Sequence, residues 1–276
     1  MTRIGIMQGR LVPPTDNRFQ CFPRQNWAGE FELGAKAGIN CIEWIYDFYG
    51  ADVNPIATDA GIAQMKALTE KTGVQVLSIC ADYFMERPLV RATAGELAER
   101  LAMFDWLLGR GHLLGVNRMV VPFVDASRID TDAEFEGVVE TLRRILPMAE
   151  KTNIEIHLET SLPPARFASL LERLPHPLLK ANYDSGNSSS LGYKPREEFA
   201  AYGKRVGSVH IKDRLRGGGT VAPGTGDADF PALAESLKSI NYAGDFILQV
   251  ARAVPGDEVN WIQQNREFAL KRFVQG

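Results

Sequence analysis

The chain has 276 residues, of which 45% are hydrophobic and 24% charged, and its formal net charge is −3 at pH 7. This balance provides no long-range attraction to nucleic acid or to an anionic membrane, so neither is expected as a partner. The length is too great for a typical small domain and matches one barrel of alternating strands and helices, without a linker or composition break.

The three cysteines, Cys21, Cys41 and Cys80, are few, odd in number and far apart. This pattern indicates free thiols in a reducing compartment rather than a disulfide framework. The N-terminus has no apolar stretch of signal-peptide length, and no run approaches the roughly 18 apolar residues of a membrane helix. We therefore expect a cytoplasmic protein.

Short apolar runs alternate with segments of helical periodicity along the whole chain. The predicted strands are 3–7, 40–45, 74–80, 117–122, 154–159, 179–184, 206–210 and 246–249. The predicted helices are 27–37, 59–71, 94–108, 132–151, 164–173, 196–203, 230–239 and 258–274. Eight such units, without a Gly-x-Gly-x-x-Gly after the first strand, predict an α/β fold, a (β/α)8 TIM barrel forming a single domain over residues 1–276.

Turn residues mark several boundaries of these helices. Gly38, Gly73 and Gly115 each follow a helical run and are suited to a left-handed C-cap. Asp59 and Asp132 precede helical runs, where we expect N-caps.

Four predicted strands in the second half end in a side chain that can bind a metal ion: Glu159, Asp184, His210 and Gln249. The carboxyl ends of barrel strands meet at one face, where barrel enzymes carry their active sites. Divalent ions such as Mn²⁺, Mg²⁺, Co²⁺ or Zn²⁺ accept mixed oxygen and nitrogen ligands. Because three such candidates stand on consecutive strands, the sequence predicts a divalent metal site.

Each of these residues also has a structural interpretation when it is considered alone. Glu159 could form a salt bridge, Asp184 could cap the helix after it, and His210 could be a hydrogen-bonded structural residue. His157 precedes Glu159 by two residues and points the same way, one layer deeper. A buried partner role is favoured for it over direct ligation, with a supporting contact to Glu159 left open.

Polar and aromatic side chains also follow the first three strands: Gln8, then Glu43 and Trp44, then Asp82. Rings beside polar groups at a barrel mouth suit the binding of a polyol, although each residue could equally anchor a loop.

A stretch with many glycines follows His210. It contains Lys212, Arg214, Arg216 and the glycines of 217–219 and 223–226. We expect a loop that closes on the substrate, with phosphate binding and a plain surface loop as alternatives.

The segments HLET, NYDSGN and VHIKDR, followed by the stretch from Gly224 to Phe230, resemble the sugar phosphate isomerase/epimerase superfamily of xylose-isomerase-like TIM barrels. The resemblance covers essentially the whole chain. It implies that Glu159, Asp184 and His210 are metal ligands and aligns Gln249 with a fourth ligand that is normally a glutamate. In the epimerases of this family, two glutamates exchange a proton from opposite sides of the substrate.

The amide at Gln249 can coordinate a metal, but it cannot act as a general base. We therefore expect one-base isomerisation of a sugar or sugar phosphate through an enediolate, with Glu159 as the proton shuttle and His210 and Lys212 also in the catalytic set. Lys212, Arg214 and Arg252 would orient substrate oxygens or a phosphate. Glu43, Asp82 and Asp213 stay open as sources of a second acid.

Three alternatives accompany this expectation. The first two are a metal-dependent lyase or dehydratase acting on a keto-sugar or keto-glycoside, and a non-catalytic sugar-binding barrel. The third, a DNA repair endonuclease of the same fold, is disfavoured by the presence of only four histidines and by the negative net charge. Related barrels often form dimers or tetramers, so a homo-oligomer is also an open expectation.

Overall fold

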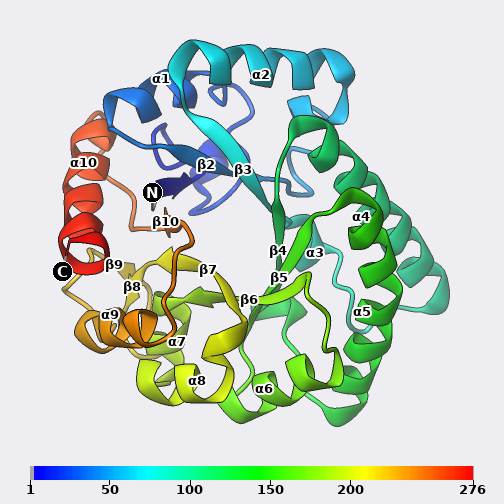
Figure 1. Ribbon diagram of the computed structural model, residues 1–276. Helices are drawn as coiled ribbons and strands as arrows, with labels where there is room; N and C mark the ends of the chain where they lie inside the picture. The colour runs from blue at the N-terminus through cyan, green and yellow to red at the C-terminus, as the bar shows by residue number, and fades with distance from the viewer. Residues whose placement is uncertain (1–2, 276) are drawn as a thin grey trace.

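The computed structural model describes residues 3–275 and shows a closed barrel of eight parallel strands. Around the barrel the strand order is β1-β10-β7-β6-β5-β4-β3-β2, with helices on the outside (Figure 1). The strands are β1 Ile4–Met7, β2 Cys41–Ile45, β3 Gln75–Cys80, β4 Arg118–Phe123, β5 Glu155–Thr160, β6 Leu179–Asp184, β7 Val206–Ile211 and β10 Phe246–Leu248. The prediction of a single (β/α)8 TIM barrel domain is confirmed.

The outer ring consists of helices that alternate with these strands. They are α1 Gly29–Lys36, α2 Asp59–Thr72, α4 Ala94–Leu114, α5 Asp132–Thr152, α6 Pro164–Arg173, α8 Pro195–Tyr202, α9 Phe230–Ser239 and α10 Glu258–Ala269. No helix among the described residues is long and apolar enough to cross a membrane.

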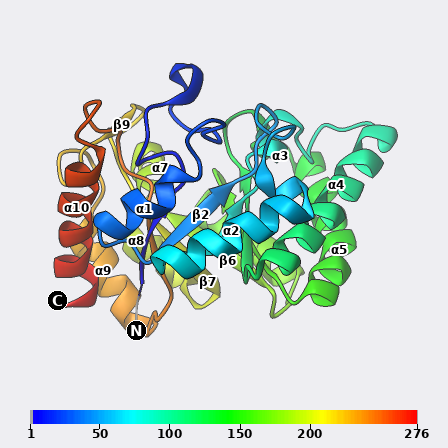
Figure 2. The same cartoon turned by 90° about the horizontal axis from the view of Figure 1, so that it is seen from above.

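Three small elements at the mouth were not expected from periodicity. They are the short helices α3 Tyr83–Glu86 and α7 Ser185–Leu191, and a two-stranded antiparallel sheet of β8 Asp213–Arg214 and β9 Thr220–Val221. The segment after β1, drawn in blue, rises above the barrel at the end opposite the N-terminus (Figure 2). These segments build the walls around the carboxyl ends of the strands.

The interior of the barrel contains a polar layer, whereas branched apolar side chains dominate the interior of most TIM barrels. Hydrogen bonds cross the interior from His210 on β7 to Glu43 on β2 and from His157 on β5 to Ser208 on β7. At the amino-terminal end, Arg118 on β4 pairs with Asp245, which precedes β10. Burying so many polar groups is costly unless each has partners, so this layer constrains its members tightly.

The helix caps agree in part with expectation. Gly73 and Gly115 are left-handed C-caps, with φ of 76° and 93°. The N-caps of α2 and α5, however, are Thr58 and Thr131, while Asp59 and Asp132 occupy the first helical position. The threonine hydroxyl reaches a free backbone N–H three residues on, whereas an aspartate inside the helix acts only through its charge.

The cap of α5 provides a test of this correction. Thr131 forms a reciprocal capping box with Glu134, so Thr131→Ala should lower the free energy of unfolding by about 1 kcal/mol. The matched variant Asp132→Ala loses only an ion pair at an exposed site with Arg166 and should cost less. Urea unfolding of both variants measures the difference. A larger loss for Asp132→Ala would show that the aspartate is the cap.

Candidate metal centre and active site

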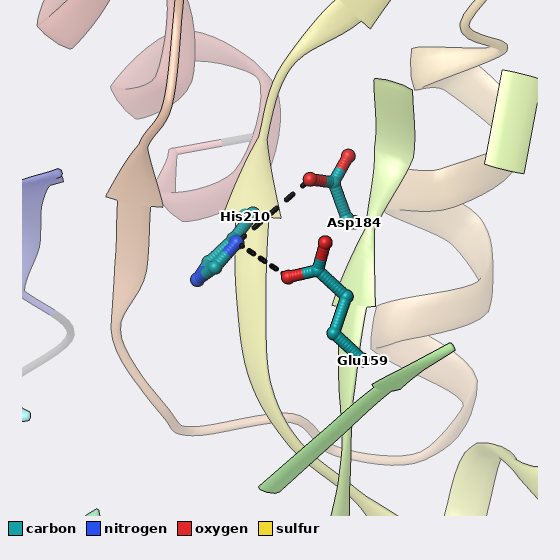
Figure 3. Close-up of side chains that lie close together, drawn as sticks. All are labelled: Glu159, Asp184 and His210. Carbon is teal, nitrogen blue, oxygen red and sulfur yellow. Dashed lines mark ion pairs between the residues drawn. The ribbon is translucent and has the colours of Figure 1, made fainter. Parts of the chain in front are cut away.

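Glu159, Asp184 and His210 converge at the carboxyl ends of β5, β6 and β7 (Figure 3). One ligand atom from each lies within 4.8 Å of the others. The Nδ1 atom of His210 is 3.3 Å from a Glu159 oxygen and 3.8 Å from Asp184 Oδ2. All three residues are buried, so three neighbouring strands deliver three ligand-type groups to one point.

The opposite ring nitrogen of His210 is held by Glu43, which lies 2.7 Å from Nε2. Glu43 also accepts a hydrogen bond of 2.7 Å from Ser78. This contact fixes the imidazole ring so that Nδ1 faces Glu159 and Asp184. Burial alone would lower the pKa of His210, but the surrounding carboxylates, with Glu43 foremost, raise that pKa well above its ordinary value.

Asp184 has two roles at once because its two oxygens face different groups. Oδ1 caps α7 by accepting from the backbone N–H groups of Gly186 and Asn187, at 2.9 and 2.8 Å. Oδ2 faces His210 and lies 3.4 Å from the ammonium of Lys212. Burial alone would raise the pKa of Asp184, but Lys212 and His210 lower this pKa to about 2. Asp184 can therefore cap α7 with one oxygen and face the candidate metal site with the other.

Two amide groups orient the Glu159 carboxylate. Asn187 Nδ2 donates to Oε1 at 2.5 Å, and Asn182 Nδ2 donates to Oε2 at 3.0 Å. The second amide also lies 3.2 Å from His210 Nδ1, so it bridges the base of the site. No salt bridge from an arginine or lysine among the described residues neutralises Glu159, which removes the simplest structural explanation of this residue.

His157 lies one layer below the site. Its Nδ1 is 2.7 Å from Ser208 Oγ, and Ser208 donates to Asn182 Oδ1 at 2.5 Å. Because Asn182 in turn donates to Glu159, His157 supports the site through two intermediates and does not touch the Glu159 carboxylate. Its second ring nitrogen contacts Glu155, at the amino-terminal end of β5.

Lys212 follows β7 and Gln249 follows β10, and together they form one side of the site. The Lys212 ammonium lies 3.3 Å from Gln249 Oε1 and 3.2 Å from Asn187 Oδ1. The Gln249 amide nitrogen donates to Gln20 Oε1 at 2.8 Å. Gln249 therefore directs its oxygen toward Lys212, on the side of Asp184, and its nitrogen toward the segment after β1.

A cavity of about 450 Å³ opens above these groups. Its volume lies within the usual range for small-molecule sites. The side chains that line it include Glu159, Lys212, Arg214, Gln249, Asp82, Gln20, Arg18 and Asn187. Arg214 donates to Asn187 Oδ1 at 3.1 Å, which holds its guanidinium at the cavity wall.

Three residues expected to bind substrate do not line this cavity. Trp44 is fully buried in an aromatic cluster with Phe22, Trp27 and Phe31, because its neighbour Glu43 takes the inward-facing position of the strand.

Arg252 donates to backbone carbonyls of the segment after β1, including those of Phe19 and Val12, and is absent from the cavity wall. Gln8 is buried and accepts from the Ile45 backbone N–H.

Two glycines of the stretch after β7, Gly224 and Gly226, do not present their N–H groups to a phosphate. The buried carboxylate of Asp213 accepts from the backbone N–H groups of Gly224, Gly226 and Ala228, at 2.8 to 3.0 Å. Asp213 therefore shapes this loop, and its bonds leave it poorly placed as a second acid.

Sequence reasoning missed Gln20, Asn182, Asn187 and Ser208. Asn182 and Ser208 precede Asp184 and His210 by two residues, so the strand period of two could have found them, as it found His157. Gln20 lies in an irregular segment, and no periodic signal places it.

The donor chemistry of the site fits a divalent cation. Two carboxylate oxygens and an imidazole nitrogen point at one another, and two of these groups repel each other unless a positive charge lies between them. Mixed carboxylate and imidazole sets of this kind bind Mn²⁺, Co²⁺ or Zn²⁺.

Comparison with known proteins finds curated relatives that are named as epimerases. The 2-epi-5-epi-valiolone 7-phosphate 2-epimerase of Actinoplanes sp. is 26% identical over 196 residues, which are 70% of this chain and 65% of that protein. The L-ribulose-5-phosphate 3-epimerase of Escherichia coli is 22% identical over 263 residues, 90% of each chain.

A solved structure of the IOLI protein with a bound zinc atom superposes with a TM-score of 0.79 at 16% identity, covering 99% of both chains. A family model described as a xylose isomerase-like TIM barrel matches residues 31–272. The chain therefore belongs to the xylose isomerase-like TIM barrel family, and its curated relatives include sugar phosphate epimerases.

Proposed function

We propose that the protein is a divalent-metal-dependent isomerase or epimerase of a sugar or sugar phosphate, with aldose–ketose isomerisation favoured. The convergence of Glu159, Asp184 and His210, with Glu159 in the wall of a cavity of about 450 Å³, carries this proposal. Two of the relatives are named as epimerases of 2-epi-5-epi-valiolone 7-phosphate and of L-ribulose 5-phosphate, and a zinc atom is bound in a protein of the same fold.

Glu159, Asp184 and His210 would hold the ion, with the carbonyl oxygen of Gln249 as a fourth donor. When bound, the ion would act as a Lewis acid that stabilises the negative charge developing on substrate oxygens as a proton leaves the adjacent carbon. Glu43 would keep the His210 ring oriented. Asn182 contacts both the ring and the Glu159 carboxylate and would fix their positions relative to each other.

Glu159 would move the proton between neighbouring carbons. Its carboxylate lines the cavity, and two amide donors fix its orientation, so it needs little rearrangement to meet a substrate. Lys212 and Arg214 line the same cavity and would orient substrate oxygens or a phosphate. Gln249 has no proton to exchange, so a single base at carbon favours isomerisation over inversion.

The direct test of the reaction is solvent deuterium exchange in a panel of ketoses, ketose phosphates and keto-glycosides. We expect deuterium at the carbon next to the carbonyl of at least one sugar, and Glu159→Gln should slow this exchange by about 10²–10⁴-fold. Nuclear magnetic resonance of the recovered sugars separates isomerisation from epimerisation and from loss of water. Exchange that survives Glu159→Gln would assign the base to another residue.

The metal site has its own prediction. His210→Ala should lower the bound divalent metal well below that of the wild-type protein and abolish turnover, because it removes one donor and unpairs Glu43. His176→Ala is the matched control, since His176 pairs with Glu150 at the surface. Elemental analysis after dialysis measures the metal. Unchanged metal content and turnover in His210→Ala would contradict the proposal.

Gln249→Glu distinguishes an active enzyme from a sugar-binding barrel that has lost turnover. The new carboxylate would face Gln20 Oε1, another acceptor, so we expect an existing activity to fall at least tenfold. Gln64→Glu on the exposed face of α2 adds the same charge away from the site and serves as the control. Activity that appears only in Gln249→Glu would instead support the non-catalytic alternative.

A further inference from the structure

Asp82 is a second buried carboxyl in the same cavity as Glu159. It follows β3, and the strand order places β3 directly across the barrel from β7, which carries His210 and Lys212. A molecule held above the candidate metal site would therefore have Lys212 on one side and Asp82 on the other, with Glu159 on β5, two strands from β3.

The partners of Asp82 are uncharged. Gln20 Nε2 donates to Oδ2 at 2.9 Å, and the Cys80 thiol donates to Oδ1 at 3.1 Å. By contrast, Asp184 contacts Lys212, and Glu43 contacts His210. No basic side chain among residues 3–275 forms a salt bridge with Asp82, and a thiol is a weak donor.

This environment makes Asp82 easier to protonate than an exposed aspartate. Burial raises the pKa of Asp82 to about 6, and the negative charges of Asp47 and Glu159 act in the same direction. The hydrogen bonds from Gln20 and Cys80 lower the pKa and only partly offset these effects. Arg10 donates to Gln20 and forms no salt bridge with Asp82.

Gln20 joins Asp82 to Gln249 and fixes the direction of the hydrogen bonds. Its Oε1 accepts from Gln249 Nε2 at 2.8 Å and from Arg10 at 3.1 Å, so its NH₂ group is the one that faces Asp82. Because Arg10 is only a donor, this orientation cannot reverse without losing a bond. The chain of contacts therefore requires a donor at position 249, which an amide provides and a carboxylate does not.

We propose that Asp82 is the second proton-transferring carboxyl of this site, supplying the acid that Gln249 cannot, and that Gln20 is the residue that positions it. This inference rests on the proposed function. As Glu159 takes the proton from carbon, Asp82 gives its proton to the adjacent carbonyl oxygen, which forms the enediol. Asp82 then takes the proton of the neighbouring hydroxyl, and Glu159 returns its own proton to the other carbon. At the end of the reaction Asp82 is protonated again and Glu159 is again a carboxylate.

The test compares Asp82→Asn with Asp105→Asn, a matched change at an exposed position of α4 that does not line the cavity. An asparagine at 82 can still donate a hydrogen bond to an oxygen but cannot pass a proton between two oxygens. We expect product formation to fall at least 100-fold in Asp82→Asn, while deuterium exchange at carbon falls less than tenfold. Asp105→Asn should change neither rate more than twofold. Equal losses of exchange and product, or no loss, would overturn the inference.

A second measurement needs no substrate. Carbon-13 spectra of aspartate-labelled protein should show one carboxyl that titrates near pH 6 and disappears in Asp82→Asn. Gln20→Met removes a donor to the ionised form, so the titration should move to higher pH. If no aspartate titrates between pH 5 and 7, the inference is wrong whatever the activity. If Asp82 titrates in this range but no sugar exchanges deuterium, the proposed function is wrong, while the conclusion that Asp82 binds a proton near pH 6 is retained.

Discussion

The arrangement depends on one electrostatic constraint, which is the gathering of Glu43, Glu159 and Asp184 around the buried ring of His210. Like charges in a site of low dielectric repel strongly, so the cluster needs a compensating positive charge. Protonation of the imidazole supplies it in part, and Lys212 supplies more at Asp184. A divalent ion among the same oxygens would satisfy the cluster more completely, which connects the geometry to the proposed chemistry.

The polar layer inside the barrel explains how this cluster stays in place. His157, Ser208 and Asn182 form a ladder of hydrogen bonds that ends on Glu159 and His210. Each member comes from a strand of the barrel. The strands therefore determine much of the orientation of the candidate ligands, and α7 at the mouth adds the contacts of Asn187 with Glu159 and with Asp184.

The sequence predicted the barrel and the converging ligands for physical reasons. Strand and helix periodicity is a local property, and the residue that ends a parallel strand must lie at the catalytic face. The same alternation argues against Trp44, since Glu43 beside it already points inward. Gln20 could not be found in this way, because its position depends on Arg10 and Arg252 holding an irregular segment over the mouth.

The contact of Gln249 with Gln20, in the segment after β1, gives a physical reason for an amide at position 249. Its amide spans Lys212 on one side and Gln20 on the other, and a carboxylate could not make both contacts. The sequence resemblance aligns position 249 with a glutamate, so under the proposed function this chain would use a different acid–base arrangement.

Anomalous diffraction from a crystal soaked in Mn²⁺ tests the central claim most directly. The account predicts one strong manganese peak bonded to Glu159, Asp184 and the Nδ1 atom of His210, at the floor of the cavity. A map without that peak, with His210 still paired to the two carboxylates after soaking, would contradict it.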